Sequence, residues 1–372
     1  MTTEEPMLST PWRSDPSAMA ERIEAWCAHG LGPGITVIDV TAPEGSGMSS
    51  ETLLFSVQRA SEAGAAPETE HYVARLAPLA SQQYVVFPAY DLELQRRVMQ
   101  TVAESTEVPV PEVVAHEPDD SWLGSPFLVM RRVDGVVPTD IPPYPFGGWL
   151  FDAPPEDQAR LERAMVRTLA RLHALTPDVH DLAFLDRPEF GTTALDQHLG
   201  YQRWYYDWAR EGQTIPLIER AFAALEKTRP AEGPTVLNWG DSRIGNVIFA
   251  DFEPAAVLDW EMAALGPAEV DVAWMIFLHT FFHDMAQRFG LPGLPEFLQR
   301  DQVVAIYEQE SGHRLHDLDW YEMFAALRFA IVSIRTTWRT VAYGDAPAPD
   351  DLDDLIMFRP LLEEMVTRAE AS

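Results

Sequence analysis

Short runs of alternating apolar and polar residues dominate the first third of the chain. Alternation predicts a β-strand at residues 35–40, a second strand follows a turn rich in glycine and serine at 52–57, and a short third strand is expected at 71–76. Residues 125–133 are apolar and strand-like. Apolar residues at helical spacing predict helices at 22–29 and 91–103. Pro109 and Pro111 force an extended segment before the last strand, because proline fixes φ and restricts the residue that precedes it. The pattern therefore predicts a small β-rich lobe.

The pattern changes at a segment crowded with proline and glycine, residues 136–155, which is incompatible with a regular helix or a central strand. Beyond it, helical spacing predicts helices at 156–175, 195–210, 215–228, 268–289, 296–311, 319–341 and 352–370. A β-like island at 235–259 interrupts them. We predict an α+β, bilobal protein with an N-terminal lobe at 1–130, a hinge at 131–135 and a helical C-terminal lobe at 136–372.

Composition limits the kinds of binding partner and the cellular compartment that we expect for this protein. The hydrophobic fraction of 47% is ample for a core. With 27 basic and 58 acidic residues the net charge is −31, which argues against nucleic acid and anionic membrane surfaces as partners. A cationic partner or a solvated acidic surface both fit this charge. A single cysteine, Cys27, no signal-like start and no apolar run of membrane-spanning length lead us to expect a soluble cytoplasmic protein.

One segment carries a combination of side chains suited to phosphoryl transfer. Asp241 and Asn246 are five positions apart, the spacing of a catalytic-loop Asp and a metal-binding Asn in kinases. Arg243 stands between them, where a cation reaches a γ-phosphate. Two apolar, strand-like segments follow, and the second ends on Asp259, in the place of a second metal-binding aspartate. An acidic β-turn with an ordinary N-cap is the alternative, and it does not explain three such residues at these spacings.

The residues around these positions resemble a known family. GDSRIGN at 240–246, LDWE at 258–261 and GPAEVDVAW at 266–274 are similar to the aminoglycoside phosphotransferase family. The resemblance extends over about residues 35–345. It implies a protein-kinase-like fold and transfer of the ATP γ-phosphoryl group to small-molecule hydroxyls, with Asp241 as base and Mg²⁺ held by Asn246 and Asp259.

The resemblance also implies a set of nucleotide contacts in the first lobe. They come from a polar loop, a strand arginine and a hinge: Ser46, Ser49, Ser50, Arg75, Met130, Arg131 and Val133. The loop hydroxyls and Arg75 would meet phosphates, and the backbone of 131–133 would meet the adenine edge. A polar hairpin turn, an outward-facing arginine and a core methionine are the corresponding structural alternatives. The chain has only one lysine, Lys227, so arginine must fill the role that lysine often has, or the role is absent.

The sequence departs from the family pattern in two places. Gln95 stands where the family has the glutamate that pairs with the strand cation, and Glu93 is the other candidate, on a different face of the helix. Trp239 replaces a histidine of mostly structural role before Gly-Asp, so it removes no base. His173 and Asp271 match family positions, and we expect both to be structural, Asp271 by anchoring the catalytic loop.

We therefore predict an ATP- and Mg²⁺-dependent O-phosphotransferase acting on a small-molecule hydroxyl. Acidic residues in the second lobe suit an aminoglycoside. Aromatic residues at 201–208 could instead stack on a planar or acyl substrate, as in a kinase of hydroxyacyl groups or another metabolite, or could be helix core. A non-catalytic nucleotide-binding module is the remaining alternative, and retention of Asp241, Asn246 and Asp259 argues against it. The sequence does not specify the oligomeric state.

Overall fold

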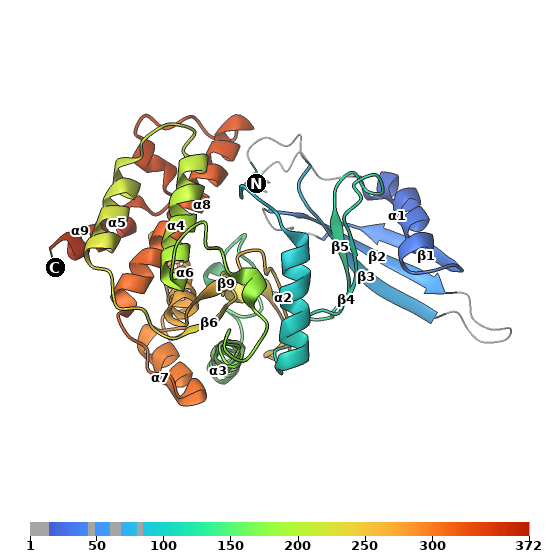
Figure 1. The fold of residues 1–372 in the computed structure, drawn as a ribbon, viewed down its shortest axis with the longest axis horizontal. Helices are drawn as coiled ribbons and strands as arrows, with labels where there is room; N and C mark the ends of the chain where they lie inside the picture. The colour runs from blue at the N-terminus through green and yellow to red at the C-terminus, as the bar shows by residue number, and fades with distance from the viewer. Residues whose placement is uncertain (1–14, 44–48, 60–67, 80–84, 372) are drawn as a thin grey trace. The chain divides into compact units, whose positions relative to one another are not determined.

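The computed structural model describes residues 15–43, 49–59, 68–79 and 85–371. The chain divides into two compact units, and the predicted α+β class is confirmed (Figure 1). One unit contains residues up to Leu92, 112–132 and 332–357, and the other contains 93–111, 133–331 and 358 onward. One of the changes of unit along the chain follows Arg132, and the expected lobe boundaries stay a prediction. Residues 93–111, which the sequence division places in the first lobe, are grouped with the second unit. Residues 332–357, which it places in the second lobe, are grouped with the first unit.

The N-terminal unit is built on an antiparallel sheet in the order β1-β2-β3-β5-β4. Its elements are α1 (Pro16–Gly30), β1 (Ile35–Thr41), β2 (Glu51–Arg59), β3 (Glu68–Leu76), β4 (Val113–Glu117) and β5 (Phe127–Arg131). The extended segment expected after Pro111 is strand β4. In the register of the sheet, Arg75 on β3 pairs with Thr52 on β2 and with Leu128 on β5.

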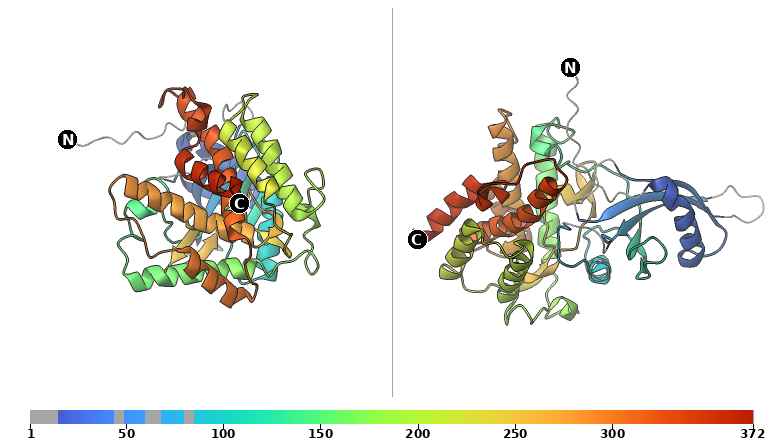
Figure 2. Two further views of the ribbon diagram at one scale, coloured as in Figure 1. Left: turned by 90° about the vertical axis from the view of Figure 1, so that its left-hand side faces the viewer. Right: turned by 90° about the horizontal axis from the view of Figure 1, so that it is seen from above.

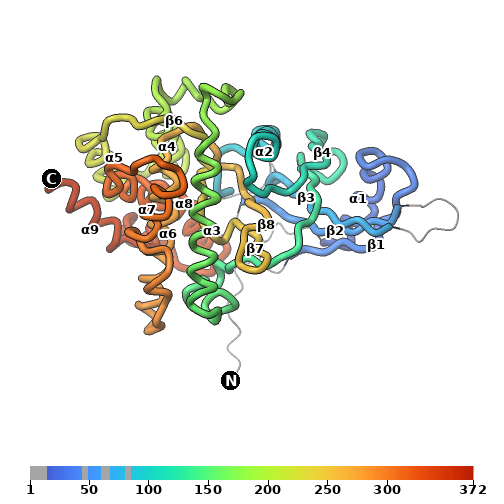
Figure 3. Tube along the Cα trace, turned by 90° about the horizontal axis from the view of Figure 1, so that it is seen from below, coloured from blue at the N-terminus to red at the C-terminus, as the bar shows by residue number. Residues whose placement is uncertain are grey.

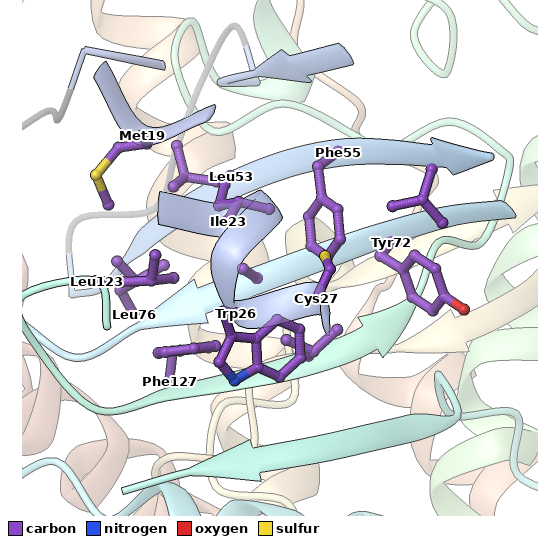
Figure 4. Close-up of a cluster of buried hydrophobic side chains, with 13 residues drawn as sticks. Met19, Ile23, Trp26, Cys27, Leu53, Phe55, Tyr72, Leu76, Leu123 and Phe127 are labelled. Carbon is purple, nitrogen blue, oxygen red and sulfur yellow. The ribbon is translucent and has the colours of Figure 1, made fainter. Parts of the chain in front are cut away.

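The core of this unit lies where α1 covers the sheet (Figure 4). Ile23, Trp26 and Cys27 point from the helix toward Phe55 and Phe127 on the strands, and all five are at most 2% exposed. Trp26 meets the Phe127 ring edge-on, with ring centroids 5.2 Å apart. Burial raises the pKa of the Cys27 thiol to about 12, so this thiol is a core side chain and not a nucleophile.

The C-terminal unit is mainly helical. Its helices are α2 (Leu92–Ser105), α3 (Pro155–Leu172), α4 (Ala194–Ala209), α5 (Pro216–Lys227), α6 (Glu269–Arg288), α7 (Arg300–Ser311), α8 (Leu318–Ala342) and α9 (Arg359–Glu370). Leu92 and the end of α8 from Val332 are grouped with the other unit. The helix expected at 352–370 is broken: a short 3₁₀ turn, η4 (Leu352–Leu355), precedes α9, whose first turn contains Pro360.

The β-like island forms two hairpin-like pairs that carry the candidate site. Strand β6 (Thr235–Asn238) pairs with β9 (Ala264–Pro267), which the sequence pattern did not predict. Strands β7 (Val247–Ala250) and β8 (Glu253–Val257), which lie between β6 and β9 in the sequence, pair with each other. Helix α3 runs beside α7 and β8 (Figure 3), and α5 lies beside α9 (Figure 2).

Helix α6 forms the centre of this unit, because apolar residues surround it on most sides and 14 of its residues are buried. Asp271 and His279 interrupt its apolar sequence, and both are buried. Among the described residues, no helix combines the length and the apolar character that crossing a bilayer requires.

Candidate active site

The catalytic segment predicted from sequence is a buried loop between β6 and β7. It contains Asp241 and Arg243 and a 3₁₀ turn, η3 (Ile244–Asn246), that ends on Asn246. Gly240 turns the chain into this loop with φ +90°, and a Cβ there would lie 2.0 Å from the carbonyl oxygen of Met262. Only glycine meets both conditions, which explains the Gly-Asp pair.

Three side chains donate hydrogen bonds to the Asp241 carboxylate. Trp274 Nε1 donates to Oδ1 at 2.7 Å, and Asn246 Nδ2 donates to Oδ2 at 2.7 Å. Arg243 Nε donates to Oδ2 at 3.0 Å. The loop therefore brings together Asp241, Arg243 and Asn246, and helix α6 adds a donor that the sequence analysis had not identified.

Asp259 lies close enough to Asp241 for their charges to interact. Burial, and then the charge of Asp259, raise the pKa of Asp241 to about 7, while the bonds from Trp274 and Asn246 oppose this shift. Asp259 has φ +60°, in the left-handed region, between β8 and β9. Two neighbouring carboxylates and an amide are hard oxygen donors of the kind that a divalent cation prefers.

Arg243 is shared between two carboxylates. It binds Asp241 through Nε and forms an ion pair with Asp140 through Nη1. Burial lowers the pKa of Arg243, and the charges of Asp259 and Glu261 oppose that shift. Asp140 belongs to the proline-rich segment, and Gly245 permits its close approach, because a Cβ there would be 2.7 Å from Asp140 Oδ1. The sequence gives no sign of this partner beyond an acid among prolines.

Asp271 holds the backbone of the loop from the first turn of α6. Its carboxylate is fully buried and accepts hydrogen bonds from Trp239 N at 2.6 Å and Gly240 N at 2.8 Å. Its carbonyl oxygen accepts from Ser242 Oγ at 2.7 Å. His173 Nε2 lies 3.1 Å from the same carboxylate. These contacts are the anchoring expected for Asp271, and they place His173 behind the loop.

Trp239, the residue that departs from the family pattern, connects the loop that contains Asp241 with the segment that contains Asp259. Its indole Nε1 donates to the carbonyl oxygens of Leu258 at 2.8 Å and Asp259 at 3.2 Å. The ring packs against Trp260, with centroids 5.9 Å apart. The substitution therefore keeps a hydrogen-bond donor beneath the segment that carries Asp259.

Two further residues complete the surroundings of Asp241. Trp274 on α6 carries the Nε1 donor described above, and the Arg328 guanidinium on α8 lies 4.4 Å from the centroid of its ring. Arg328 Nη2 donates to the carbonyl oxygen of Gly240 at 2.7 Å. In the sequence, Arg328 stands out only as a single cation in the apolar run AALRFAIV, because charged residues are rarely buried.

The residues expected to contact the nucleotide lie mostly in the N-terminal unit. Ser46 is outside the described residues, whereas Ser49 and Ser50 are buried. Arg75 Nε donates to Ser50 Oγ at 3.2 Å, so strand β3 and the end of the polar loop are joined. Met130 is buried on β5.

The backbone of the expected hinge is partly occupied by the sheet. Arg131 N donates to Glu112 O at 2.9 Å, and Arg132 N donates to His71 O at 3.0 Å. The Arg131 side chain pairs with Glu70 at 2.9 Å. Val133 begins the second unit. Two of the backbone N–H groups of the expected hinge, those of Arg131 and Arg132, are therefore already hydrogen-bonded.

Helix α2 carries both candidates for the carboxylate that would pair with Arg75. Glu93 forms an ion pair with Arg96 at 2.6 Å. Gln95 is 2% exposed, and its Nε2 has no hydrogen-bond partner among the described residues. Glu93 and Gln95 belong to the C-terminal unit and Arg75 belongs to the N-terminal unit, so which of the two pairs with Arg75 stays a prediction.

Comparison with known proteins gives a family match. The family model described as the phosphotransferase enzyme family, APH, matches residues 56–305, which is more than half of the chain. Among curated proteins, the chain is 26% identical over 309 residues to IBR3 of Arabidopsis thaliana, whose name describes it as an acyl-CoA dehydrogenase. The matched region covers 78% of this chain and 35% of that protein. The chain is 29% identical over 224 residues to acyl-CoA dehydrogenase family member 10 of Mus musculus, covering 57% and 20%. The chain thus spans about a third or less of these relatives.

Solved structures show the same fold at low identity. A Ralstonia eutropha protein classed with the aminoglycoside phosphotransferases has a TM-score of 0.65 and 23% identity, covering 94% of this chain and 98% of that one. An aminoglycoside phosphotransferase APH(4)-Ia mutant, in complex with AMP-PNP and hygromycin B, has a TM-score of 0.57 and 17% identity, covering 95% and 100%. The kinase-like fold expected from sequence is confirmed.

Proposed function

This chain belongs to the phosphotransferase enzyme family, APH, and on that premise we propose that it transfers the γ-phosphoryl group of ATP to a hydroxyl of a small molecule. The observation that carries the proposal is the assembly of Asp241, Asn246 and Asp259 around one buried loop. A non-catalytic nucleotide-binding module would need neither a buried carboxylate held by three donors nor a second carboxylate beside it.

Asp241 is the proposed base. Its hydrogen bonds to Trp274 and Asn246 fix the carboxylate, which accepts the proton of the acceptor hydroxyl as that oxygen attacks the γ-phosphorus. The new oxygen–phosphorus bond forms as the bond from the γ-phosphorus to the bridging oxygen breaks, and ADP carries away the released electron pair. Most of the rate enhancement in such a reaction comes from positioning and electrostatic stabilisation.

Asn246 and Asp259 are the proposed ligands of Mg²⁺, which would neutralise phosphate charge and orient the γ-phosphoryl group. Asn246 uses Nδ2 for Asp241, which leaves its amide oxygen on the opposite side. Within the described residues, no three His, Cys, Asp or Glu side chains gather as a metal site. Mg²⁺ is usually bound by one or two carboxylates together with nucleotide phosphates, and in protein kinases an Asp and an Asn hold it.

Positive charge on the phosphates would come from two arginines. Arg243 lies beside Asp241 in the loop, and its ion pair with Asp140 holds the guanidinium there. Arg75 is held by Ser50 in the N-terminal unit. We assign Ser46, Ser49 and Ser50 to the phosphates, and Met130 and the backbone of 131–133 to adenine. Within that backbone the N–H donor would be that of Val133, because the N–H groups of Arg131 and Arg132 already donate to Glu112 O and His71 O.

An aminoglycoside is one candidate acceptor, with antibiotic resistance as the consequence. It is supported by the net charge of −31 and by fold neighbours whose structures contain hygromycin B or kanamycin. A hydroxyacyl group or related metabolite is the second candidate, supported by the relatives named for acyl-CoA dehydrogenases. Trp204, half-exposed against Phe190 and Tyr201, is available for stacking, whereas Trp320 and Tyr321 are core.

A cytoplasmic location fits the buried, unpaired Cys27.

The test is a panel of hydroxylated acceptors with ATP, in the presence and absence of Mg²⁺. We expect Mg²⁺-dependent formation of ADP and a phosphorylated product with one class of acceptor. Salt separates the two candidates, because exposed charge pairs are screened over about 8 Å at physiological ionic strength. Aminoglycoside binding should weaken steeply with salt, whereas binding of an uncharged acceptor should be insensitive to salt and weakened by Trp204→Ala. Absence of transfer to every acceptor and to water would contradict the proposal.

A further inference from the structure

Arg328 on α8 is a buried cation to which the mechanism above gives no role. It is 2% exposed, and Nη2 donates to the carbonyl oxygen of Gly240 at 2.7 Å. In the part of the chain that the structure describes, Nε and Nη1 are buried without a hydrogen-bond partner. Burying a guanidinium with two donors unsatisfied is costly, so other interactions must compensate for it.

The compensation comes from an aromatic face and two carboxylates. The guanidinium lies over the Trp274 ring at 4.4 Å, and a cation over a tryptophan face is most stabilised when desolvated, as here. Burial lowers the pKa of Arg328 to about 10, and the charges of Asp271 and Asp241 oppose the shift. Arg328 therefore remains cationic at neutral pH.

Arg328 also lies over the Phe324 ring of its own helix at 5.8 Å, and its other two contacts lead to Asp241. Gly240, whose carbonyl it binds, immediately precedes Asp241 in the loop. Trp274, whose ring it covers, donates Nε1 to Asp241 Oδ1 at 2.7 Å. A guanidinium is rigid and planar, so one group can hold the loop backbone through its donor edge and the indole through its face. Asp241 is thus restrained on the backbone side and on the side-chain side by one residue of α8.

We propose that Arg328 is a positioning residue for Asp241, which acts through the Gly240 carbonyl and the Trp274 indole. The inference rests on the phosphotransfer function proposed above. Displacing a reacting group by about 1 Å can lower turnover by about 100-fold, so loss of either restraint should reduce kcat. Because the proposed role of Arg328 is to position the base and not to bind the nucleotide, KM for MgATP should change little.

The experiment measures kcat and KM for ADP release from MgATP without added acceptor, so that water takes the phosphoryl group. Arg328→Met keeps the volume and removes the charge, and Trp274→Phe keeps the ring and removes the donor. We expect each to lower kcat by at least ~10-fold and to keep KM within about twofold. The double variant should be no slower than about the slower single variant, because both changes act on the same carboxylate oxygen.

Matched controls separate positioning from packing. Arg339→Met removes another buried arginine of α8, and Trp320→Phe removes a buried indole donor that binds the Leu225 carbonyl at 2.9 Å. Both should leave kcat unchanged, and thermal unfolding should show all variants folded. If Arg328→Met does not fold, Arg328→Lys replaces it, with a kcat at least about threefold lower.

Two results would overturn the inference. One is a folded Arg328 variant with wild-type kcat, and the other is full additivity of the two single effects in ln kcat, which would mean that the residues act independently. Absence of MgATP turnover and of phosphate transfer in the wild-type protein would instead contradict the proposed function.

Discussion

Replacing Asp271 with asparagine should disorganise the catalytic loop, because this carboxylate uses both oxygens as acceptors. Oδ1 accepts from Gly240 N at 2.8 Å, and Oδ2 accepts from Trp239 N at 2.6 Å, with His173 Nε2 at 3.1 Å. Asparagine is nearly isosteric but has one oxygen and one NH₂ group. Whichever way the amide turns, a backbone N–H loses its acceptor and faces another donor.

The expected loss of stability follows from the kind of bond removed. A hydrogen bond to a charged group contributes about 1.5–3 kcal/mol, and an orphaned buried donor adds its own desolvation penalty. Arg328 would also lose one of its two compensating charges. We therefore expect Asp271→Asn to lower the free energy of unfolding of the C-terminal unit by about 3 kcal/mol. Turnover of MgATP should fall as well, because Trp239 and Gly240 lead directly into Asp241.

Urea unfolding followed by tryptophan fluorescence, together with MgATP turnover, measures both effects. Glu269→Gln is the matched control, since Glu269 is buried two positions earlier on α6 but binds His313 Nε2 at 3.1 Å and His316 N at 3.2 Å instead of the loop. It should leave turnover unchanged. An Asp271→Asn protein within about 1 kcal/mol of wild type, with normal turnover, would refute the reasoning.

Three further predictions concern the metal, the loop turn and the N-terminal unit. Asp259→Asn should abolish most of the Mg²⁺-dependent increase in nucleotide affinity, because a neutral amide replaces a hard anionic ligand; calorimetry with and without Mg²⁺ tests this, and an unchanged increase would show that the metal site lies elsewhere. Gly240→Ala should lower the free energy of unfolding by at least ~3 kcal/mol, since the new Cβ would lie 2.0 Å from the Met262 carbonyl oxygen at φ +90°; near-wild-type urea stability would contradict this. Hydrogen bonds from Tyr72 and then Arg59 lower the pKa of Glu70 to about 2 from 4.5, so the stabilisation by Glu70 is present above about pH 4.5 and is lost as the pH falls toward 2. Glu70→Gln should therefore flatten the decline of stability between these pH values, by no more than ~3 kcal/mol, and an unchanged pH profile of unfolding would exclude this role.

The sequence was informative where chemistry depends on local spacing. Asp241, Arg243 and Asn246 lie within six consecutive residues, so one loop conformation brings them together. Asp259 follows strands β7 and β8, and the apolar pattern of these strands is recognisable in the sequence. The alternation of strands β1 to β3 and the helical spacing of α3 and α5 were equally local.

The rest of the site depends on packing between distant segments. Asp140, Trp274 and Arg328 reach the loop from the proline-rich segment, α6 and α8, and the spacing of residues says nothing about such contacts. Strand β9 was missed because ALGP has little strand character of its own and pairs only where β6 is available. The helix expected at 352–370 was wrong in its first part, where η4 stops before Pro360 at the start of α9.

The most direct test of the account is transfer of a radiolabelled γ-phosphoryl group from ATP by wild-type protein and by Asp241→Ala. Wild-type protein should transfer the label, with Mg²⁺, to one hydroxylated acceptor of the panel or to water. Asp241→Ala should bind MgATP with nearly unchanged affinity and transfer at least ~100-fold more slowly, because loss of the base affects the transition state. Asp251→Ala, in the exposed turn between β7 and β8, should transfer like wild type. Full activity in Asp241→Ala would contradict the assignment of the catalytic loop.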